Sequence, residues 1–350
     1  MNFLFFKQLH HRPAWLSIAF FFLLATLLAP SSQALAVPIF KDSAKRTISS
    51  KKQTVTLSNH SAIPVLGKYR NISQHKKNIG SKQVASKKTG NIRKKISAKS
   101  AIIIDAQNGR TLFSRSPDLP RQPASTIKVL TGAIALKSLS ANDQVPVSNK
   151  AARQPRSKIY LDQRKQYKAD DLINAVLMAS ANDASVALAE KIAGSEKSFA
   201  KMMTLRAELW GAKNTVCKTA SGLTAKGQTS TARDLAAIFR HAMQDKEFSH
   251  RMGKTKTLTT DGNMLRSHNK ALWQVEGTEG GKTGYTNAAR QTYVGKFKRG
   301  NDEIIVAIMG SETMWSDIKH LVEYGFERKI ALNKQSQQLL AKVDSDSLSR

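Results

Sequence analysis

The sequence predicts an α+β domain with one antiparallel sheet flanked by helices, and three observations support this fold class. First, an Asn-Gly pair, which favours the positive φ angles of a tight hairpin turn, separates the short apolar runs 101–104 and 111–113. Second, two further strand-like runs, 291–297 and 303–309, flank a polar turn near the end of the chain. Third, the segment between the two hairpins reads as a series of helices. Strands from both ends of the domain must therefore pair non-locally if they share one sheet.

Six helices are expected in this domain. The run that starts at Ser125 is apolar with few helix breakers, so its helix should be buried. Two helices follow each other directly around a short break at residues 180–182. Thr231 precedes its helix in a pattern close to a capping box. The expected helices span residues 125–139, 170–179, 183–192, 198–210, 231–243 and 314–328.

The first 36 residues have the composition of an export signal. Lys7 and Arg12 precede the apolar run 15–29, and Ala34-Leu35-Ala36 follows as an A-x-A cleavage site. The apolar run is short for a membrane span, although an uncleaved N-terminal anchor is the alternative. We therefore expect residues 1–36 to be a signal peptide and the protein to be exported, to the periplasm or to the extracellular cell-wall space.

Residues 37–99 are expected to form a disordered basic tether. They hold sixteen Lys and Arg residues against one acid, Asp42, and their apolar residues occur singly, so they bury too little apolar surface to offset the entropy of ordering. The whole chain has 56 Lys and Arg against 25 Asp and Glu, which favours a polyanionic partner. Export argues against nucleic acid. The tether then makes either a loose electrostatic contact with an anionic wall or membrane, or no specific contact, as a solvated spacer.

Ser125 and Lys128 are the first pair of candidate catalytic residues. They are three positions apart, so on a helix their side chains share one face, and a base within reach is what a serine hydroxyl needs to become a nucleophile. Lys128 acts as a base only if burial and nearby positive charge lower its pKa toward neutrality. A single Ser-x-x-Lys string can be coincidence, but only the one at Ser125 opens a buried helix. The strings begin at Ser49, Ser73, Ser125, Ser198, Ser267 and Ser316.

Ser180 and Asn182 lie at the break between two predicted helices. Ser140 and Ser267 begin similar Ser-x-Asn strings, but only Ser180 ends one apolar helix and is followed by another. Buried polar groups need partners, and a catalytic cleft supplies them: Ser180 can relay a proton, and Asn182 can bind a substrate amide. The alternative is an ordinary helix cap, in which Asn182 or Asp183 starts the next helix.

A glycine-flanked Lys282-Thr283 pair precedes the final hairpin, in the string GGKTGYT at positions 280–286. Glycines let a substrate backbone lie close to the edge of a strand. Lys282 and Thr283 can then hold a terminal carboxylate by charge-assisted hydrogen bonds. The alternative is a glycine-rich corner of a hairpin.

Together, and in this order, the three elements are a signature of penicillin-binding proteins and class A β-lactamases. Residues 100 to about 330 resemble the low-molecular-mass penicillin-binding proteins, the serine-type D-alanyl-D-alanine carboxypeptidases. The resemblance extends to longer strings: SANDA at 180–184, ASGLT at 220–224 and TARDLA at 231–236. It implies a β-lactamase/transpeptidase-like fold, in which a helical subdomain accompanies the sheet.

The resemblance also implies a reaction and its partners. Ser125 would attack the peptide bond between the last two D-alanines of a peptidoglycan stem peptide, with Lys128 as base and Ser180 passing a proton to the departing D-alanine. Water would then release the acyl-enzyme. The oxyanion hole would consist of the backbone N–H groups of Ser125 and Tyr285. β-Lactam antibiotics would inhibit the enzyme, and no metal or organic cofactor is implied. The substrate-binding residues would be Asn182, Lys282, Thr283, Gly284 and Tyr285.

The sequence departs from the family pattern at its C-terminal end. Many relatives carry a further β-domain and a membrane-binding amphipathic helix, whereas residues 331–350 are expected to be a short tail, so we expect no C-terminal membrane anchor. Relatives often supply an arginine after the last strand for the substrate carboxylate. No arginine stands there, and Arg290 is the candidate substitute. Four scattered histidines are expected to be surface or core residues rather than zinc ligands: His241, His250, His268 and His320.

Three alternative functions compete with the carboxypeptidase. No Glu-x-x-Leu-Asn string follows Ser180, so slow release of penicillin is expected rather than β-lactamase activity. A D,D-endopeptidase that cuts peptidoglycan crosslinks uses almost the same chemistry and stays open. A non-catalytic basic cell-wall-binding protein is the alternative of another class, and the intact motifs at all three positions argue against it.

Overall fold

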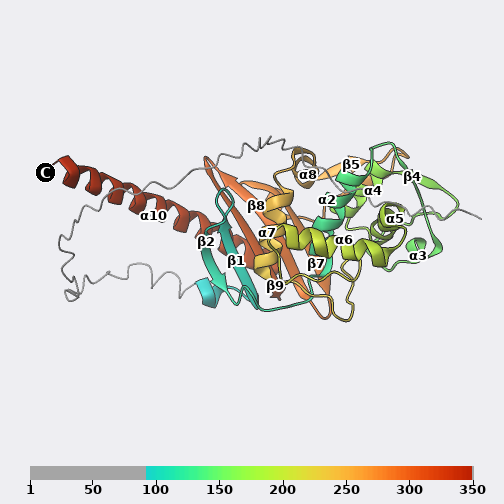
Figure 1. Ribbon diagram of the computed structural model, residues 1–350, viewed down its shortest axis with the longest axis horizontal. Helices are drawn as coiled ribbons and strands as arrows, with labels where there is room; N and C mark the ends of the chain where they lie inside the picture. The colour runs from blue at the N-terminus through green and yellow to red at the C-terminus, as the bar shows by residue number, and fades with distance from the viewer. Residues whose placement is uncertain (1–91, 349–350) are drawn as a thin grey trace, which may run out of the picture. The chain divides into compact units, whose positions relative to one another are not determined.

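The computed structural model describes residues 92–348 of the chain, and a five-stranded antiparallel sheet runs through it (Figure 1). The five strands are β1 (Ser100–Asp105), β2 (Thr111–Arg115), β7 (Thr278–Thr286), β8 (Arg290–Arg299) and β9 (Asp302–Ser311). Their order in the sheet is β2-β1-β9-β8-β7, so the hairpin near the start of the domain pairs with strands near its end. Ile103 lies opposite Val306 in this pairing, which confirms the predicted non-local sheet.

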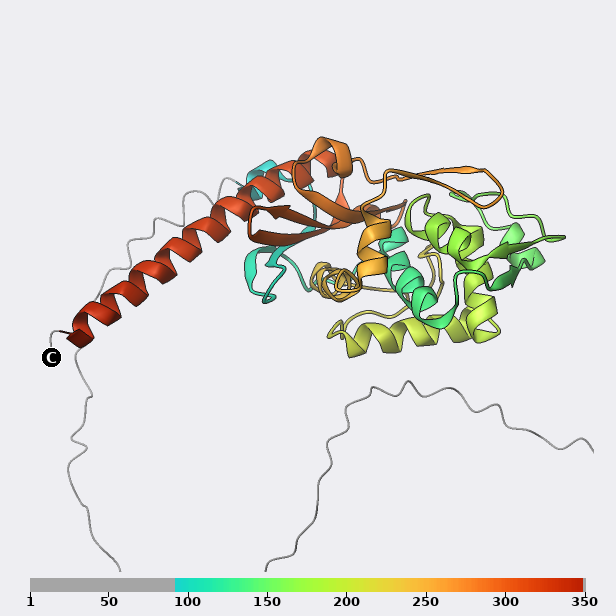
Figure 2. The same cartoon turned by 90° about the horizontal axis from the view of Figure 1, so that it is seen from above.

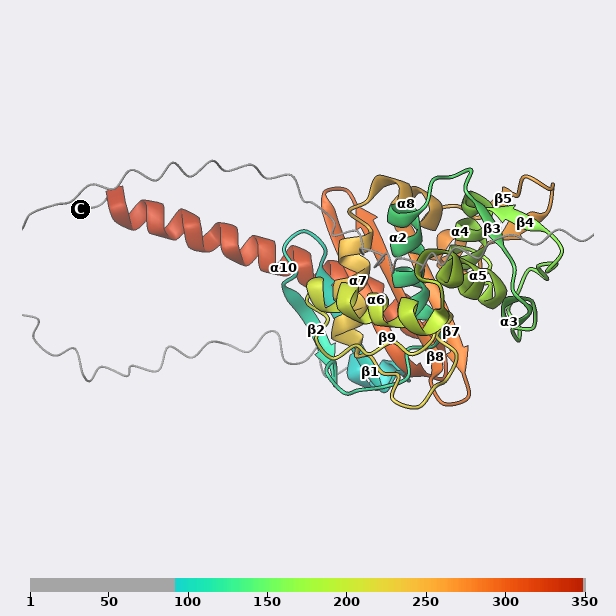
Figure 3. The ribbon, with the colours of Figure 1, turned by 45° about the vertical axis from the view of Figure 1, so that its right-hand side comes forward.

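Most helices lie between β2 and β7 in the chain, and one more follows β9. They are η1 (Ala124–Ile127), a 3-10 turn that leads into α2 (Lys128–Ser138), then α3 (Asn149–Ala152), α4 (Ala169–Leu177), α5 (Asn182–Ala193), α6 (Glu196–Leu209), α7 (Ala232–Ala242), α8 (Lys246–Met252), α9 (Ala271–Gln274) and α10 (Met314–Leu348). Figures 1 and 3 show α2, α4, α5 and α6 gathered on the side of the sheet where β7 lies. This group is the expected helical subdomain.

Both faces of the sheet are covered by helices. Successive residues of a strand point to opposite faces, so a strand can contribute to two cores. Ile102 and Ile104 of β1 pack into the larger hydrophobic core together with α2, α4, α5 and α7. Ala101 and Ile103 pack into a second core with α10. Figure 2 shows the strands between α10 on one side and most of the other helices on the other. The structure therefore confirms the α+β class with an antiparallel sheet flanked by helices.

Two small sheets were not predicted. Each consists of two antiparallel strands of three residues, which are too short to show a clear alternation of apolar and polar residues. Both lie outside the five-stranded sheet. The pairs are β3 (Gln144–Pro146) with β4 (Gln166–Lys168), and β5 (Lys256–Leu258) with β6 (Met264–Arg266).

The two ends of the domain differ from the prediction. Ile92 and Ile96 lie one helical turn apart and are buried in the core next to α10, and the backbone N–H of Ala98 donates to Asp317 at 2.8 Å. The domain therefore begins before the expected boundary at residue 100. The last helix continues to residue 348 rather than ending near 328, since the intervening sequence is rich in Lys, Gln, Leu and Ala, which favour helix. Residues 1–36 and 37–91 of the predicted signal peptide and tether lie outside the described residues. Across residues 92–348, no helix combines the length and apolar character needed to cross a bilayer.

Candidate active site

Ser125, the candidate nucleophile, lies on η1 directly before α2. In a 3-10 helix the side chains at positions i and i+3 eclipse one another, which brings Lys128 Nζ to 2.9 Å from Ser125 Oγ. Two hydroxyls hold this turn in place, because those of Thr126 and of Thr292 on β8 both donate to the carbonyl of Pro123. Local geometry and anchoring to the sheet thus place the serine and the lysine in direct contact.

Lys128 is fully buried, and its three oxygen partners can satisfy either a protonated or a neutral amine. Its Nζ lies 2.7 Å from Asn182 Oδ1 and 2.6 Å from the carbonyl oxygen of Ser221, and both of these atoms only accept hydrogen bonds. A neutral amine has two N–H donors for them and one lone pair left, which then faces the Ser125 hydroxyl. In this arrangement Ser125 donates toward Lys128, as deprotonation of the serine requires.

The surroundings lower the pKa of both buried lysines of the site. Burial lowers the pKa of Lys128 well below 10.5, the charge of Lys282 lowers it further, and Asp183 acts in the opposite direction. Burial also lowers the pKa of Lys282, to about 7. A lysine whose pKa approaches neutrality can act as a general base. The shift of the Lys128 pKa thus has the direction that a general base requires.

Ser180 and Asn182 occupy the break between α4 and α5, and each contacts one of the two lysines. Ser180 has a φ of +59°, a left-handed conformation that is costly for a residue with a β-carbon, and its Oγ accepts from Lys282 Nζ at 2.9 Å. Asn182 accepts from Lys128. The N-cap of α5 is Ala181, without a side-chain cap. Asn182 does start α5, as the alternative had it, but the helix has no side-chain cap and both side chains contact the lysines instead.

β7 is an edge strand of the sheet, and its Lys-Thr-Gly segment runs beside the nucleophile turn. A β-carbon at Gly284 would lie 2.8 Å from the backbone N of Ser125 and 2.5 Å from Thr292 Oγ1, so the approach requires glycine. The next residue, Tyr285, has an exposed side chain. The glycine-rich string is thus part of a strand and not the corner of a hairpin, and the outer edge of that strand is open to a substrate backbone.

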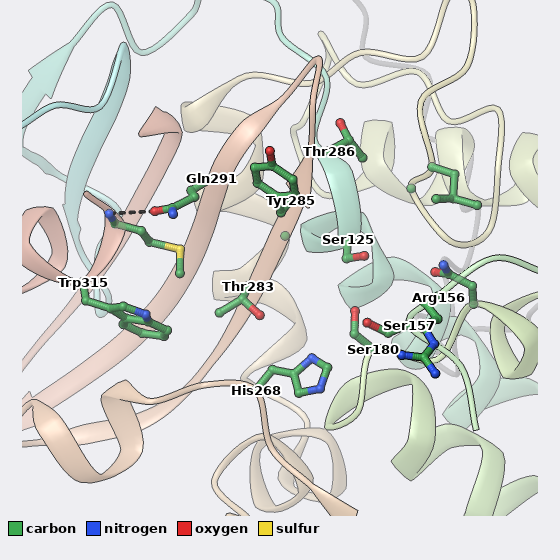
Figure 4. A pocket seen from close by; sticks show the side chains of 15 residues that line it. Ser125, Arg156, Ser157, Ser180, His268, Thr283, Tyr285, Thr286, Gln291 and Trp315 are labelled. Carbon is green, nitrogen blue, oxygen red and sulfur yellow. Dashed lines mark hydrogen bonds between the residues drawn. The ribbon is translucent and has the colours of Figure 1, made fainter. Parts of the chain in front are cut away.

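The candidate residues meet at one cleft with a volume of about 430 Å³. Figure 4 shows the side chains of Ser125 and Ser180 in the same part of this cleft, with Thr283 across from them and His268 beside Ser180. Lys128 and Lys282 lie buried behind it. Of the residues that the sequence indicated, the cleft is lined by Ser125, Ser180, Asn182, Thr283, Gly284 and Tyr285. It is also lined by Arg156, Ser157, Gly222, Leu223, His268, Thr286, Gln291, Met314 and Trp315.

The structure does not bring Arg290 to this cleft. Arg290 lies at the start of β8 and pairs with Glu312 through two hydrogen bonds. It is absent from the residues that line the cleft. No local sequence feature marks this pair, because Glu312 lies 22 positions away, just after the neighbouring strand. The expectation that Arg290 binds the substrate carboxylate is therefore not supported by its position.

His268 and Gly222 belong to the site although no sequence feature assigned them to it. His268, expected at the surface or in the core, lines the cleft, and burial together with the charges of the two active-site lysines lowers its pKa. Gly222 packs against the nucleophile turn, since a β-carbon there would lie 2.1 Å from the carbonyl oxygen of Ala124. The string at 220–224 resembles the family in sequence, but only the fold shows that it supports the turn and supplies an acceptor to Lys128.

Comparisons with known proteins agree with this geometry. A family model described as D-alanyl-D-alanine carboxypeptidase matches residues 83–313. A D-alanyl-D-alanine carboxypeptidase of Mycobacterium tuberculosis is 34% identical over 250 residues, which cover 68% of this chain and 84% of the relative. One of Bacillus subtilis is 32% identical over 231 residues, which cover 62% of this chain and 58% of the relative. Among solved structures, ampicillin-bound penicillin-binding protein D2 of Listeria monocytogenes has a TM-score of 0.61 at 27% identity. The superposition covers 66% of this chain and 98% of the Listeria chain.

Proposed function

The chain belongs to the D-alanyl-D-alanine carboxypeptidase family, and from its site we propose that it removes the terminal D-alanine from peptidoglycan stem peptides through an acyl-enzyme on Ser125. One observation carries the proposal. Ser125 Oγ contacts a fully buried Lys128 whose other two partners are acceptors, so a nucleophile and its base are already in place. The open edge of β7 beside them offers a place for a peptide backbone.

In the proposed acylation, Ser125 Oγ bonds to the carbonyl carbon of the penultimate D-alanine while its proton passes to Lys128. The backbone N–H groups of Ser125 and Tyr285 hold the charge that develops on the carbonyl oxygen, an assignment supported by the close approach of β7 to the turn. The C–N bond then breaks, and the nitrogen of the departing D-alanine takes the proton from Lys128 through Ser180. In deacylation, water attacks the ester, Lys128 accepts a proton from it, and Ser125 recovers that proton as it leaves.

We assign substrate binding to Asn182, Thr283 and the edge of β7. Asn182 Nδ2 donates to the carbonyl of Pro155, which leaves its second hydrogen for a substrate carbonyl. Lys282 Nζ is engaged by Ser180 Oγ and by the carbonyl of Thr283. The hydroxyl of Thr283, which lies in the cleft (Figure 4), therefore makes the direct contact with the terminal carboxylate, and the charge of Lys282 attracts that carboxylate from behind.

β-Lactams are expected to react with the same serine and to inhibit. Class A β-lactamases use a glutamate to activate the deacylating water, and none of the residues that line this cleft is a glutamate or an aspartate. The penicillin acyl-enzyme should therefore be long-lived. The related protein from Listeria was solved with ampicillin bound, and we extend this binding to the present chain.

The location of the enzyme is a proposal that rests on sequence. The leader-like residues 1–36 support export to the periplasm or cell-wall space, and the charge of residues 37–99 supports an electrostatic contact with an anionic wall or membrane. The relatives compared above include carboxypeptidases. Neither the D,D-endopeptidase nor the non-catalytic cell-wall-binding protein gains comparable support.

Covalent labelling tests the proposed function. The chain without residues 1–36, incubated with a fluorescent penicillin, should carry a stable adduct that mass spectrometry maps to Ser125, and a Ser125→Ala variant should carry none. Release of D-alanine from a pentapeptide that ends in D-Ala-D-Ala then separates a carboxypeptidase from an endopeptidase. Folded protein that gives no adduct, no penicillin turnover and no D-alanine would overturn the proposal.

A further inference from the structure

We propose that Arg156 binds a free carboxylate on the acyl-donor part of the stem peptide, so that the enzyme selects anionic stem peptides. The inference rests on the proposed function and adds a substrate class to it. None of the fifteen residues that line the cleft is acidic, and Arg156 is its permanently charged basic residue, since burial lowers the pKa of the other basic one, His268. The charge of the cleft therefore favours a peptide with a carboxylate beyond its terminal one.

Among the described residues, Arg156 has no carboxylate partner of its own. Within residues 92–348 its side chain forms no ion pair and no hydrogen bond, and its guanidinium lies over the ring of Tyr160 at 5.7 Å. By contrast, Arg164 on the same loop pairs with Asp162, and Arg290 is paired as well. A guanidinium presents N–H donors in a fork that matches a carboxylate. At the rim of a peptide-binding cleft, an unpaired guanidinium is thus suited to a carboxylate of the substrate.

The loop that carries Arg156 is held by the Ser-x-Asn segment itself. Asn182 donates from Nδ2 to the carbonyl of Pro155 at 3.0 Å and from its backbone N to the carbonyl of Ser157 at 2.8 Å, so hydrogen bonds fix the residues on both sides of Arg156. The next residue, Asp183, accepts from two backbone N–H groups further along the loop. Because its backbone is already fixed, Arg156 loses less entropy when it binds a ligand.

The position of Arg156 selects the acyl-donor side of the scissile bond. Arg156 stands between the two residues that contact Asn182, and we assign the substrate carbonyl to Asn182. Figure 4 shows Arg156 across the cleft from Gln291 and Trp315. The carboxylate of the departing D-alanine is assigned to Thr283. Arg156 therefore meets a residue that precedes D-Ala-D-Ala. A stem peptide whose diamino acid has a free carboxylate fits this description, and one whose carboxylate is amidated does not.

Two pentapeptides that differ only in this carboxylate, free or amidated, test the inference. D-Alanine release is measured for the wild type, Arg156→Gln and Arg153→Gln, the last replacing an exposed arginine of the same segment that does not line the cleft. The wild type and Arg153→Gln should prefer the free carboxylate by about tenfold in kcat/KM, mainly through KM. In Arg156→Gln the ratio should fall to near unity.

Salt gives a second readout of the same contact. The preference of the wild type should shrink as ionic strength rises, because the ion pair forms at an exposed rim, and that of Arg156→Gln should not change. A wild type without preference, or an Arg156→Gln variant that keeps it, would overturn the role of Arg156 and leave the proposed function standing. Wild type that releases D-alanine from neither peptide and forms no penicillin adduct would overturn the proposed function, and this inference with it.

Discussion

Replacing Lys282 with methionine should stabilise the fold while it impairs the enzyme. Lys282 is only 1% exposed, and within residues 92–348 no carboxylate forms an ion pair with it. Its Nζ contacts the neutral oxygens of Ser180 and Thr283. Burial lowers its pKa from 10.5 to about 7, which means that the folded protein holds the charged form at a cost. Methionine has a similar length and carries no charge to desolvate.

The pKa shift sets the size and the pH dependence of this effect. A pKa of about 7 in the folded state against 10.5 in the unfolded chain corresponds to about 5 kcal/mol. The cost is fully present below about pH 7, where the lysine is protonated in both the folded and the unfolded state. It fades as the pH rises toward the unfolded pKa of 10.5, because the lysine is then neutral in the folded state and becomes neutral in the unfolded chain as well. Two lost hydrogen bonds subtract about 1 kcal/mol each, which leaves a net gain of about 3 kcal/mol on the acid side.

Urea and thermal unfolding measure this gain directly. At about pH 6 the Lys282→Met variant should exceed the wild type by about 3 kcal/mol, or about 6–12 °C in melting temperature, and near about pH 10 the difference should vanish or reverse. Lys329→Met is the matched control. Lys329 is equally buried, but it pairs with Asp105 at 3.1 Å, so its loss should destabilise the fold by about 3–5 kcal/mol at both pH values. A Lys282→Met variant less stable than the wild type at about pH 6, or a difference independent of pH, would refute the reasoning.

Two more perturbations address the chemistry. Acylation of Ser125 by penicillin should speed up with rising pH until Lys128 is deprotonated, because its pKa lies well below 10.5 and only the neutral amine accepts a proton. Stopped-flow fluorescence gives this profile. Lys128→Arg, which stays charged, should acylate at least about 100-fold more slowly, and a flat profile in the wild type would contradict the role of the lysine. Gly284→Ala should force a methyl group to within 2.8 Å of the Ser125 backbone N, lower the stability by about 1–3 kcal/mol and slow acylation. An unchanged melting temperature and rate would show that β7 does not lie so close to the turn.

The catalytic contacts differ in how far sequence alone could predict them. Ser125 and Lys128 are three positions apart, and one turn of helix is enough to bring them together. The contacts of Ser180 with Lys282 and of Asn182 with Lys128 span 102 and 54 positions. No local rule connects such residues, so only the order of the motifs and their family resemblance indicated one site.

The parts that escaped prediction depend on contacts between irregular or distant segments. Arg156 lies in a loop without periodicity. Only the hydrogen bonds of its two neighbours with Asn182 place it at the active site. Arg290 has the positive charge that a substrate carboxylate needs and lies at the start of β8, next to the Lys-Thr-Gly strand. No sequence feature marks Glu312 as its partner. α10 continues past the predicted end at residue 328 because no strong stop signal, such as a glycine or a proline, follows that residue.

The place of β1 between β2 and β9 has a consequence for the synthesis of the chain. Ile103 pairs with Val306, about 200 positions later, so β1 and β2 leave the ribosome long before their partner exists. Closing so long a loop is slow, and until then an apolar strand with an open edge can pair with another chain. β7, β8 and β9 are also the last strands to be made. A nascent chain stopped before β9 would hold Ser125 and Lys128 in sequence but would lack the sheet that turns them into an active site.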